Sequence, residues 1–212
     1  MTEVAPNALV TSEAAGRREI LNAATELFSA KGYSRASIRE LAARAGCSTA
    51  NLYHHFSSKY DIFVTLIEGA MDDHLAGVRR ALEHHDDPVE QLASVLRNHL
   101  VVHMTRPEVR LLYDDFHPLT GRELERFIDE RDLYEHGVRE IVQRGVREGA
   151  FEVEDPAIAV RAAMGACNSV DRWFRHTGPL TVEQVAAASA DFLLAGFGVR
   201  RRPVSPTEEG ST

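Results

Sequence analysis

Hydrophobic residues recur with a helical period along almost the whole chain, and no stretch alternates convincingly with the two-residue period of a strand. In the first segment they lie about one turn apart and stop before Gly32: Ile20, Leu21, Ala24, Leu27 and Phe28. Glycine is a common residue just beyond the end of a helix. The pattern therefore predicts an all-α protein whose first helix ends near residue 31.

Two short helices are predicted after this one. Ser37 stands before an apolar stripe and Glu40 follows three residues later, which is the arrangement of a capping box. Gly46 ends that helix, and Ser48 can cap the next one, in which Leu52 and Phe56 face inward. Three helices of this length and spacing are typical of a helix-turn-helix unit.

The rest of the chain continues the helical pattern, for about nine helices in total. The further helices are expected over residues 58–83, 88–106, 108–116, 120–148, 157–176 and 181–196. Residues 1–12 and 199–212 lack apolar periodicity, and we interpret both as disordered tails. Residues 13–59 then form an N-terminal helix-turn-helix domain, and residues 60–198 form a larger helical domain.

Charge is distributed unevenly along the chain. The net charge is −8, which alone argues against binding to nucleic acid. Residues 1–60, however, carry seven basic against five acidic residues, whereas the remainder is strongly acidic. Such an asymmetry would orient the molecule with its N-terminal end toward a polyanion.

Several other classes of protein are disfavoured. No apolar run is long enough to span a membrane, and no secretory signal can be recognised at the N-terminus. The two cysteines, Cys47 and Cys167, fit a reducing compartment, so we expect a cytoplasmic protein. The nucleotide-binding, hydrolase and metalloprotease motifs are absent from the sequence. We therefore expect neither catalysis nor a cofactor, and we assign no resident metal.

The third predicted helix carries the candidate DNA-reading surface. Its outward side chains are small, polar or aromatic, which suits base edges, thymine methyl groups and phosphates in a major groove. They are Ser48, Thr49, Ala50, Tyr53, His54 and His55. Lys59 opens the next helix, where its charge and the free backbone N–H groups can meet a phosphate.

Residues 17–63, RREILNAATELFSAKGYSRASIRELAARAGCSTANLYHHFSSKYDIF, resemble the DNA-binding segment of TetR-family repressors. The resemblance includes the A-A-x-A-G-x-S turn and the closing L-Y-x-H-F-x-S-K. Position by position it implies phosphate contacts from Ser37, Tyr53, His55 and Lys59. It implies base or groove contacts from Ser48, Thr49, Ala50 and His54. Many relatives carry Lys or Gly at the positions of Thr49 and Ala50, so the operator sequence does not transfer.

The last two long predicted helices have faces of small residues, at positions 162–168 and 186–190. Small residues let helices approach closely, either within one chain or across a two-fold axis. The family resemblance favours the second arrangement, because the last two long helices there form the dimer interface. A double-stranded DNA operator with two half-sites would then be read by a homodimer.

The segment CNSVDRWFRHTGPLT, residues 167–181, resembles the R-W-Y-R-x-x-G-P-L-T region of a TetR subgroup that responds to acyl-CoA thioesters. His176 departs from the Pro that is frequent there. Aromatic rings beside arginines suit an anion with an apolar end. The candidate small-molecule effector site comprises Met104, Tyr113, Phe116, Phe127, Tyr134, Asn168, Arg172, Trp173, Phe174 and Arg175.

Alternatives remain open at this point. The aromatic and methionine positions can equally be plain core. His99 and His103, four residues apart, can hold a metal ion, with Asp114, Asp115 or His117 completing the site. The leading hypothesis is a repressor released by its effector, an acyl-CoA or another apolar acid. The alternatives are a different apolar ligand, a metal effector, an activator, or a ligand-binding or catalytic protein with an incidental helix-turn-helix.

Overall fold

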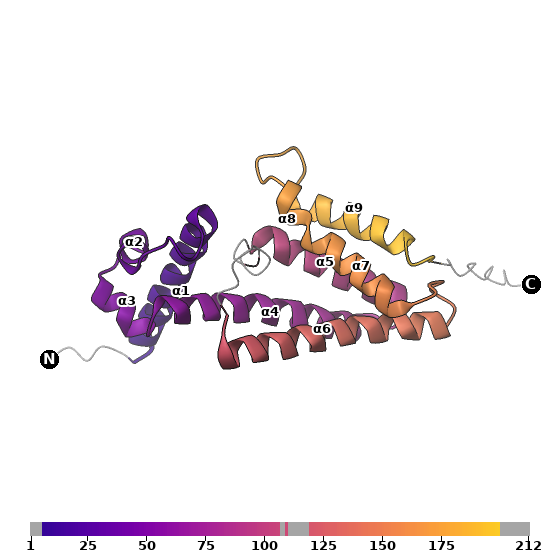
Figure 1. Cartoon of the computed structure of the whole chain (residues 1–212), viewed down its shortest axis with the longest axis horizontal. Coiled ribbons are helices and arrows are strands. Elements are labelled where there is room, and N and C mark those ends of the chain that lie inside the picture. The colour runs from indigo at the N-terminus through magenta and orange to yellow at the C-terminus, as the bar shows by residue number, and fades with distance from the viewer. Residues whose placement is uncertain (1–5, 107–108, 110–118, 200–212) are drawn as a thin grey trace, which may run out of the picture.

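The computed structural model describes residues 6–106, 109 and 119–199, and in this part of the chain every regular element is a helix (Figure 1). The all-α prediction is thereby confirmed. The helices are α1 (Pro6–Lys31), α2 (Ile38–Arg44), α3 (Thr49–His55), α4 (Lys59–His84), α5 (Pro88–Thr105), α6 (Gly121–Arg147), α7 (Pro156–Asn168), α8 (Val170–Trp173) and α9 (Val182–Ala195).

The N-terminal helices are defined by the local signals that the sequence contains. Ser37 and Glu40 form the predicted capping box of α2, and Ser48 caps α3 through the backbone N–H of Asn51. Gly32 and Gly46 adopt φ values of 81° and 67°, in the left-handed region that favours glycine. The turns on either side of α2 therefore depend on local chemistry, and the two predicted caps are confirmed.

Helix α4 joins two separate hydrophobic cores. Its first half, including Phe63 and Ile67, packs in the core of the helix-turn-helix end with Phe28, Leu52 and Phe56. Its second half contributes to the core of the body, together with residues of α5, α6, α7 and α9. A shift of α4 would therefore displace the helix-turn-helix end relative to the body.

Within the body, α5 is the central helix. It contacts α4 and α6 as well as α7, α8 and α9. Leu92, Leu96 and Leu100 lie on its buried face and are at most 2% exposed. Figure 1 shows the helix-turn-helix at one end of an elongated molecule and the C-terminal end of α9 at the other.

Four expectations differ from the structure or lie outside it. Helix α1 begins at Pro6, so residues 6–12 are helical rather than a disordered tail; proline suits a first turn, and no helix breaker follows it before Gly16. The expected helix over 157–176 ends at Trp173 and is divided at Ser169, whose hydroxyl donates to the carbonyl of Ala166. The expected helix over 108–116 and the tail from residue 200 lie outside the described residues.

In the described part of the chain, none of the helices combines the length and the hydropathy that a membrane crossing requires.

Candidate nucleic-acid interface and effector region

Helix α3 presents one face to solvent and buries the other. Thr49, Ala50, Tyr53 and His54 are exposed, and Tyr53 is 55% exposed despite its aromatic ring. Leu52 is completely buried on the opposite face, in the core of the helix-turn-helix end. The predicted base-contacting residues therefore share one accessible face at the end of the molecule.

Two of the predicted contact serines also serve as helix caps. The Ser48 hydroxyl accepts the N–H of Asn51 at 3.1 Å, which leaves its proton available to an acceptor on DNA. The Ser37 hydroxyl accepts the N–H of Glu40 and donates to Glu40 Oε2 at 2.6 Å. The Ser37 hydroxyl can donate to a phosphate only if its hydrogen bond to Glu40 Oε2 is broken first.

The end of α3 is fixed by a residue that the sequence analysis did not single out. Arg17 on α1 donates from Nη1 to the His55 carbonyl at 3.2 Å, and its guanidinium lies 4.2 Å from the centre of the Phe56 ring. His54 Nε2 lies 3.6 Å from Glu13 Oε1, also on α1. Arg17 opens the segment that resembles the family, but its partners are almost forty residues away, so no local signal could identify this role.

Lys59 lies at the start of α4, as predicted, but its ammonium already has partners. Nζ donates to the carbonyls of Tyr33 and Ala36, each at 2.9 Å, and lies 4.3 Å from the centre of the Tyr33 ring. Partial burial lowers the pKa of Lys59. The side chain thus connects α4 to the α1–α2 turn, and contact with a phosphate remains a prediction.

The predicted effector residues do not form one group. Met104 and Tyr134 are buried in the core of the body. The side chain of Asn168 is hydrogen-bonded to His99, which is also hydrogen-bonded to Tyr134. Phe127 instead packs with the core of the helix-turn-helix end. Tyr113 and Phe116 lie outside the described residues.

The α8 segment carries the remaining predicted effector residues. Arg172, Trp173 and Arg175 are exposed, whereas Phe174 is half-buried against the core of the body. Arg175 Nη1 donates to the carbonyls of Arg172 and Phe174, which holds its guanidinium beside the end of α8. The segment that resembles the acyl-CoA-responsive subgroup therefore presents exposed arginines and an exposed indole. They follow about one turn after Asn168, whose side chain is hydrogen-bonded to the buried His99.

A cluster of buried histidines lies where α4 and α5 meet. His74 of α4 joins His99 and His103 of α5, and one ring nitrogen from each lies within 4.8 Å of the others. Burial lowers the pKa of His74 to about 2, of His103 to about 3 and of His99 to about 4, so all three rings are neutral at pH 7.

The third member of this cluster was missed, and Asp114, Asp115 and His117, which had been considered as completing ligands, lie outside the described residues. His74 stands in the apolar stripe of α4 between Ala70 and Val78. A histidine at such a position is the one signal in the sequence that could have indicated it.

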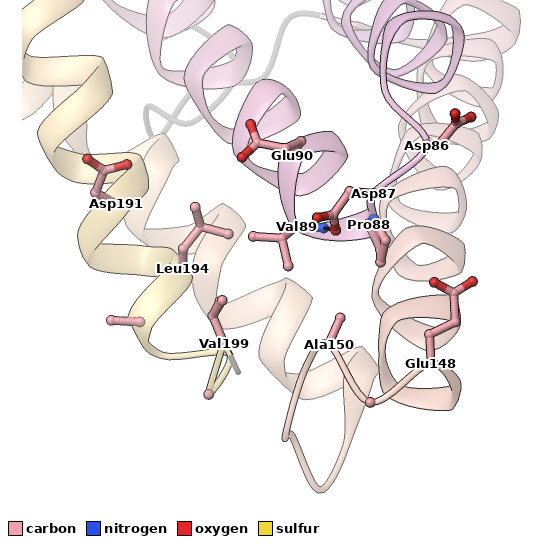
Figure 2. A pocket seen from close by; sticks show the side chains of 13 residues that line it. Asp86, Asp87, Pro88, Val89, Glu90, Glu148, Ala150, Asp191, Leu194 and Val199 are labelled. Carbon is pink, nitrogen blue, oxygen red and sulfur yellow. Dashed lines mark hydrogen bonds between the residues drawn. The ribbon is translucent and has the colours of Figure 1, made fainter. Parts of the chain in front are cut away.

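An open hollow of about 1330 Å³ lies at the end of the molecule opposite the helix-turn-helix (Figures 1 and 2). Its lining includes the carboxylates of Asp86, Asp87, Glu90, Glu148 and Asp191, which are labelled in Figure 2. Asp87 caps α5, and Asp191 lies 3.6 Å from Arg97. Because the lining is acidic, this hollow does not suit an anionic effector.

A capped helix with an exposed polar face, carried on an acidic helical body, is the arrangement of a DNA-binding transcriptional regulator. Residues 20–66 match the family described as bacterial regulatory proteins, tetR family, and residues 85–197 match the tetracyclin repressor-like C-terminal domain. The chain belongs to the TetR family of transcriptional regulators, as the resemblance of residues 17–63 predicted.

Relatives of known identity agree with this membership. The chain is 28% identical to the transcriptional repressor KstR2 of Rhodococcus jostii over 91% of its own length and 96% of the relative's. It resembles the structure of the TetR-family regulator PfmR of Thermus thermophilus with a TM-score of 0.76 and 35% identity, covering 83% of this chain and 97% of PfmR. The structure of AibR with isovaleryl coenzyme A and operator DNA is 25% identical, with a TM-score of 0.73, covering 84% and 98%.

Proposed function

We propose that this chain is a transcriptional repressor that binds a palindromic operator as a homodimer and is released by an acyl-CoA thioester or another apolar acid. The observation that carries the proposal is the exposed face of α3, with Thr49, Tyr53 and His54 outward over a buried Leu52. This binding function requires no catalysis. It places the protein in the cytoplasm with its operator, where the free thiols of Cys47 and Cys167 are stable.

The outer faces of α7 and α9 support a homodimer through these helices. On α7, Ile158, Ala162 and Gly165 are exposed along one stripe, and on α9 Ala188 and Phe192 are exposed one turn apart. Phe192 is 79% exposed and Ile158 66%, which is unusual for large apolar side chains. Small residues beside large ones allow close helix packing across a two-fold axis.

The α7–α8 segment supports an amphiphilic anion as the effector. Asn168 reaches the buried polar cluster, and the exposed Arg172 and Arg175 follow within two turns. A thioester could direct its acyl end inward while its phosphates meet the arginines. AibR was crystallised with isovaleryl coenzyme A, which makes acyl-CoA thioesters the first compounds to test here.

DNA binding is tested with duplexes from the upstream region of the protein's own gene and its neighbours. The purified protein should retard one palindromic duplex, with an affinity that falls steeply as salt rises. Tyr53→Phe should weaken binding to all duplexes alike, whereas Thr49→Ala should change the preference among half-site variants. Failure to bind any upstream duplex at low salt would refute the proposal. A reporter fused to that promoter separates repression from activation.

The effector is tested by thermal shift with short and long acyl-CoA thioesters, free coenzyme A and the free acids. A thioester that raises the melting temperature should also release the operator, and Arg172→Ala should weaken its binding but not that of a free acid. Arg122→Ala, an exposed arginine on α6, is the matched control. If no thioester shifts the melting temperature, the thioester proposal is wrong. The measurements with the free acids then decide whether the effector is another apolar acid.

A further inference from the structure

The histidine cluster contains side chains from two consecutive helices, α4 and α5. His99 and His103 lie one turn apart on α5, and their rings stack at 4.7 Å with 10° between their planes. The ring of His74, from α4, lies 4.5 Å from that of His99 and 5.6 Å from that of His103. All three side chains are at most 5% exposed.

One nitrogen of this cluster lacks the partner that burial normally demands. His74 Nδ1 is buried and makes no hydrogen bond with any residue in the described ranges 6–106, 109 and 119–199. A buried polar atom left in this way loses its hydration without gaining a protein hydrogen bond, which destabilises the fold. A neutral imidazole with a free lone pair is, however, the form that binds a metal ion.

His99 has the hydrogen bonding of a metal-ligating histidine. Its Nε2 lies 2.8 Å from Asn168 Oδ1, and because a carbonyl oxygen can only accept, Nε2 carries the proton. The lone pair is then on Nδ1, which lies 2.9 Å from the hydroxyl of Tyr134. An N–H donated to an oxygen acceptor orients the imidazole ring and raises its basicity toward a metal.

We propose that His74, His99 and His103 form a binding site for a divalent transition-metal ion, with zinc as the preferred occupant. Three imidazoles provide the nitrogen set that zinc, cobalt and nickel accept, and a fourth position is left for water, a small anion or the Tyr134 hydroxyl. Nitrogens around tetrahedral zinc lie about 3.3 Å apart, given Zn–N distances of about 2.0–2.1 Å. In this structure the three nitrogens lie within 4.8 Å of one another. Small side-chain rotations that move each nitrogen by about 1 Å would bring them to the spacing that zinc requires.

The site goes beyond the proposed function, because it concerns an ion rather than the organic effector. It would fix α4 to α5 at the middle of α4, between the part that packs with the helix-turn-helix and the part that packs with the body. Metal occupancy would then bias the position of the DNA-binding end. That consequence rests on the proposed function, whereas metal binding itself does not.

The test uses the untagged full chain, stripped with a chelator and titrated with Co²⁺. We expect one equivalent to bind with the intense visible absorption of four-coordinate cobalt, and Zn²⁺ to displace it. His74→Leu should lower the affinity at least ~100-fold, because loss of a ligand costs more than the roughly 10–100-fold that loss of an outer-shell partner brings. It should not lower the melting temperature of the metal-free protein, because leucine removes the unpartnered nitrogen and keeps the volume.

His84→Gln is the matched control, since His84 is exposed at the end of the same helix and its ring Nδ1 is hydrogen-bonded to the Arg80 carbonyl. It should bind Co²⁺ as the unmodified chain does. Weak or six-coordinate cobalt binding by the unmodified chain, or equal affinity in His74→Leu, would overturn the proposal. If His74→Leu does not fold, His103→Gln replaces it and must show the same loss. Operator affinity measured with and without Zn²⁺ then tests the coupling separately from DNA binding itself.

Discussion

The ammonium of Lys59 lies 4.3 Å from the centre of the Tyr33 ring and 2.9 Å from the Tyr33 carbonyl oxygen. Tyr33 lies in the turn before α2 and Lys59 opens α4 after α3, so their contact connects the two ends of the α2–α3 pair. Lys59 is thus a structural residue of this end of the molecule, whether or not it also meets a phosphate.

Lys59→Ala should therefore lower stability as well as DNA affinity. Loss of the hydrogen bonds to the Tyr33 and Ala36 carbonyls should reduce the free energy of unfolding by roughly 1.5–3 kcal/mol, the usual range for a hydrogen bond that involves a charged group. Urea unfolding measures this directly. Arg18→Ala, an exposed cation in the same domain, should stay within about 0.5 kcal/mol of the unmodified protein. Unchanged stability in Lys59→Ala would assign the side chain to DNA alone.

Glu40 gives the capping box of α2 its pH dependence. Hydrogen bonds from Lys31 and Ser37 lower the pKa of Glu40 from 4.5 to about 2. Its stabilising contribution is therefore complete above pH 4.5 and is lost as the pH falls through 2. Carboxyl-carbon NMR should show this titration, and Lys31→Met should move the midpoint upward. A midpoint near 4.5 in the unmodified chain would show that the box does not hold in solution.

Phe192 provides the sharpest test of the dimer interface. Phe192→Glu places a charge in the centre of the proposed apolar face and should weaken dimerisation at least ~30-fold, equivalent to about 2 kcal/mol. Sedimentation equilibrium measures the change, and operator affinity should fall with it. Leu133→Glu is the control, since Leu133 on α6 is 60% exposed on another helix. If both variants dimerise equally, the interface lies elsewhere.

Gly145 marks a close contact between α6 and the segment that follows it. A Cβ at this position would overlap the ring of Phe151, which is 3% exposed in the core of the body. Gly145→Ala should therefore destabilise the protein by roughly 1–3 kcal/mol, although alanine favours a helix. Gly69→Ala has ordinary space beside Arg106 and should be neutral or stabilising by up to about 1 kcal/mol. Equal melting temperatures for the two variants would contradict this packing.

Features that depend on neighbours in sequence could be predicted. The capping box at Ser37, the cap at Ser48 and the glycine turns at 32 and 46 each need only residues within one turn, and all are present. The exposed face of α3 followed from the same periodicity. The effector residues were harder, because Phe127 and Tyr134, two turns apart on α6, enter different cores.

The sequence alone determined the helical class, the helix-turn-helix at residues 17–63 and the family, because periodicity, caps and an ordered motif are local. Only the tertiary structure decided which distant side chains meet. It brought Lys59 to Tyr33, Arg17 to His55 and His74 to His99 and His103. These contacts depend on how the two cores orient α1, α4 and α5, and no spacing along the chain encodes that orientation.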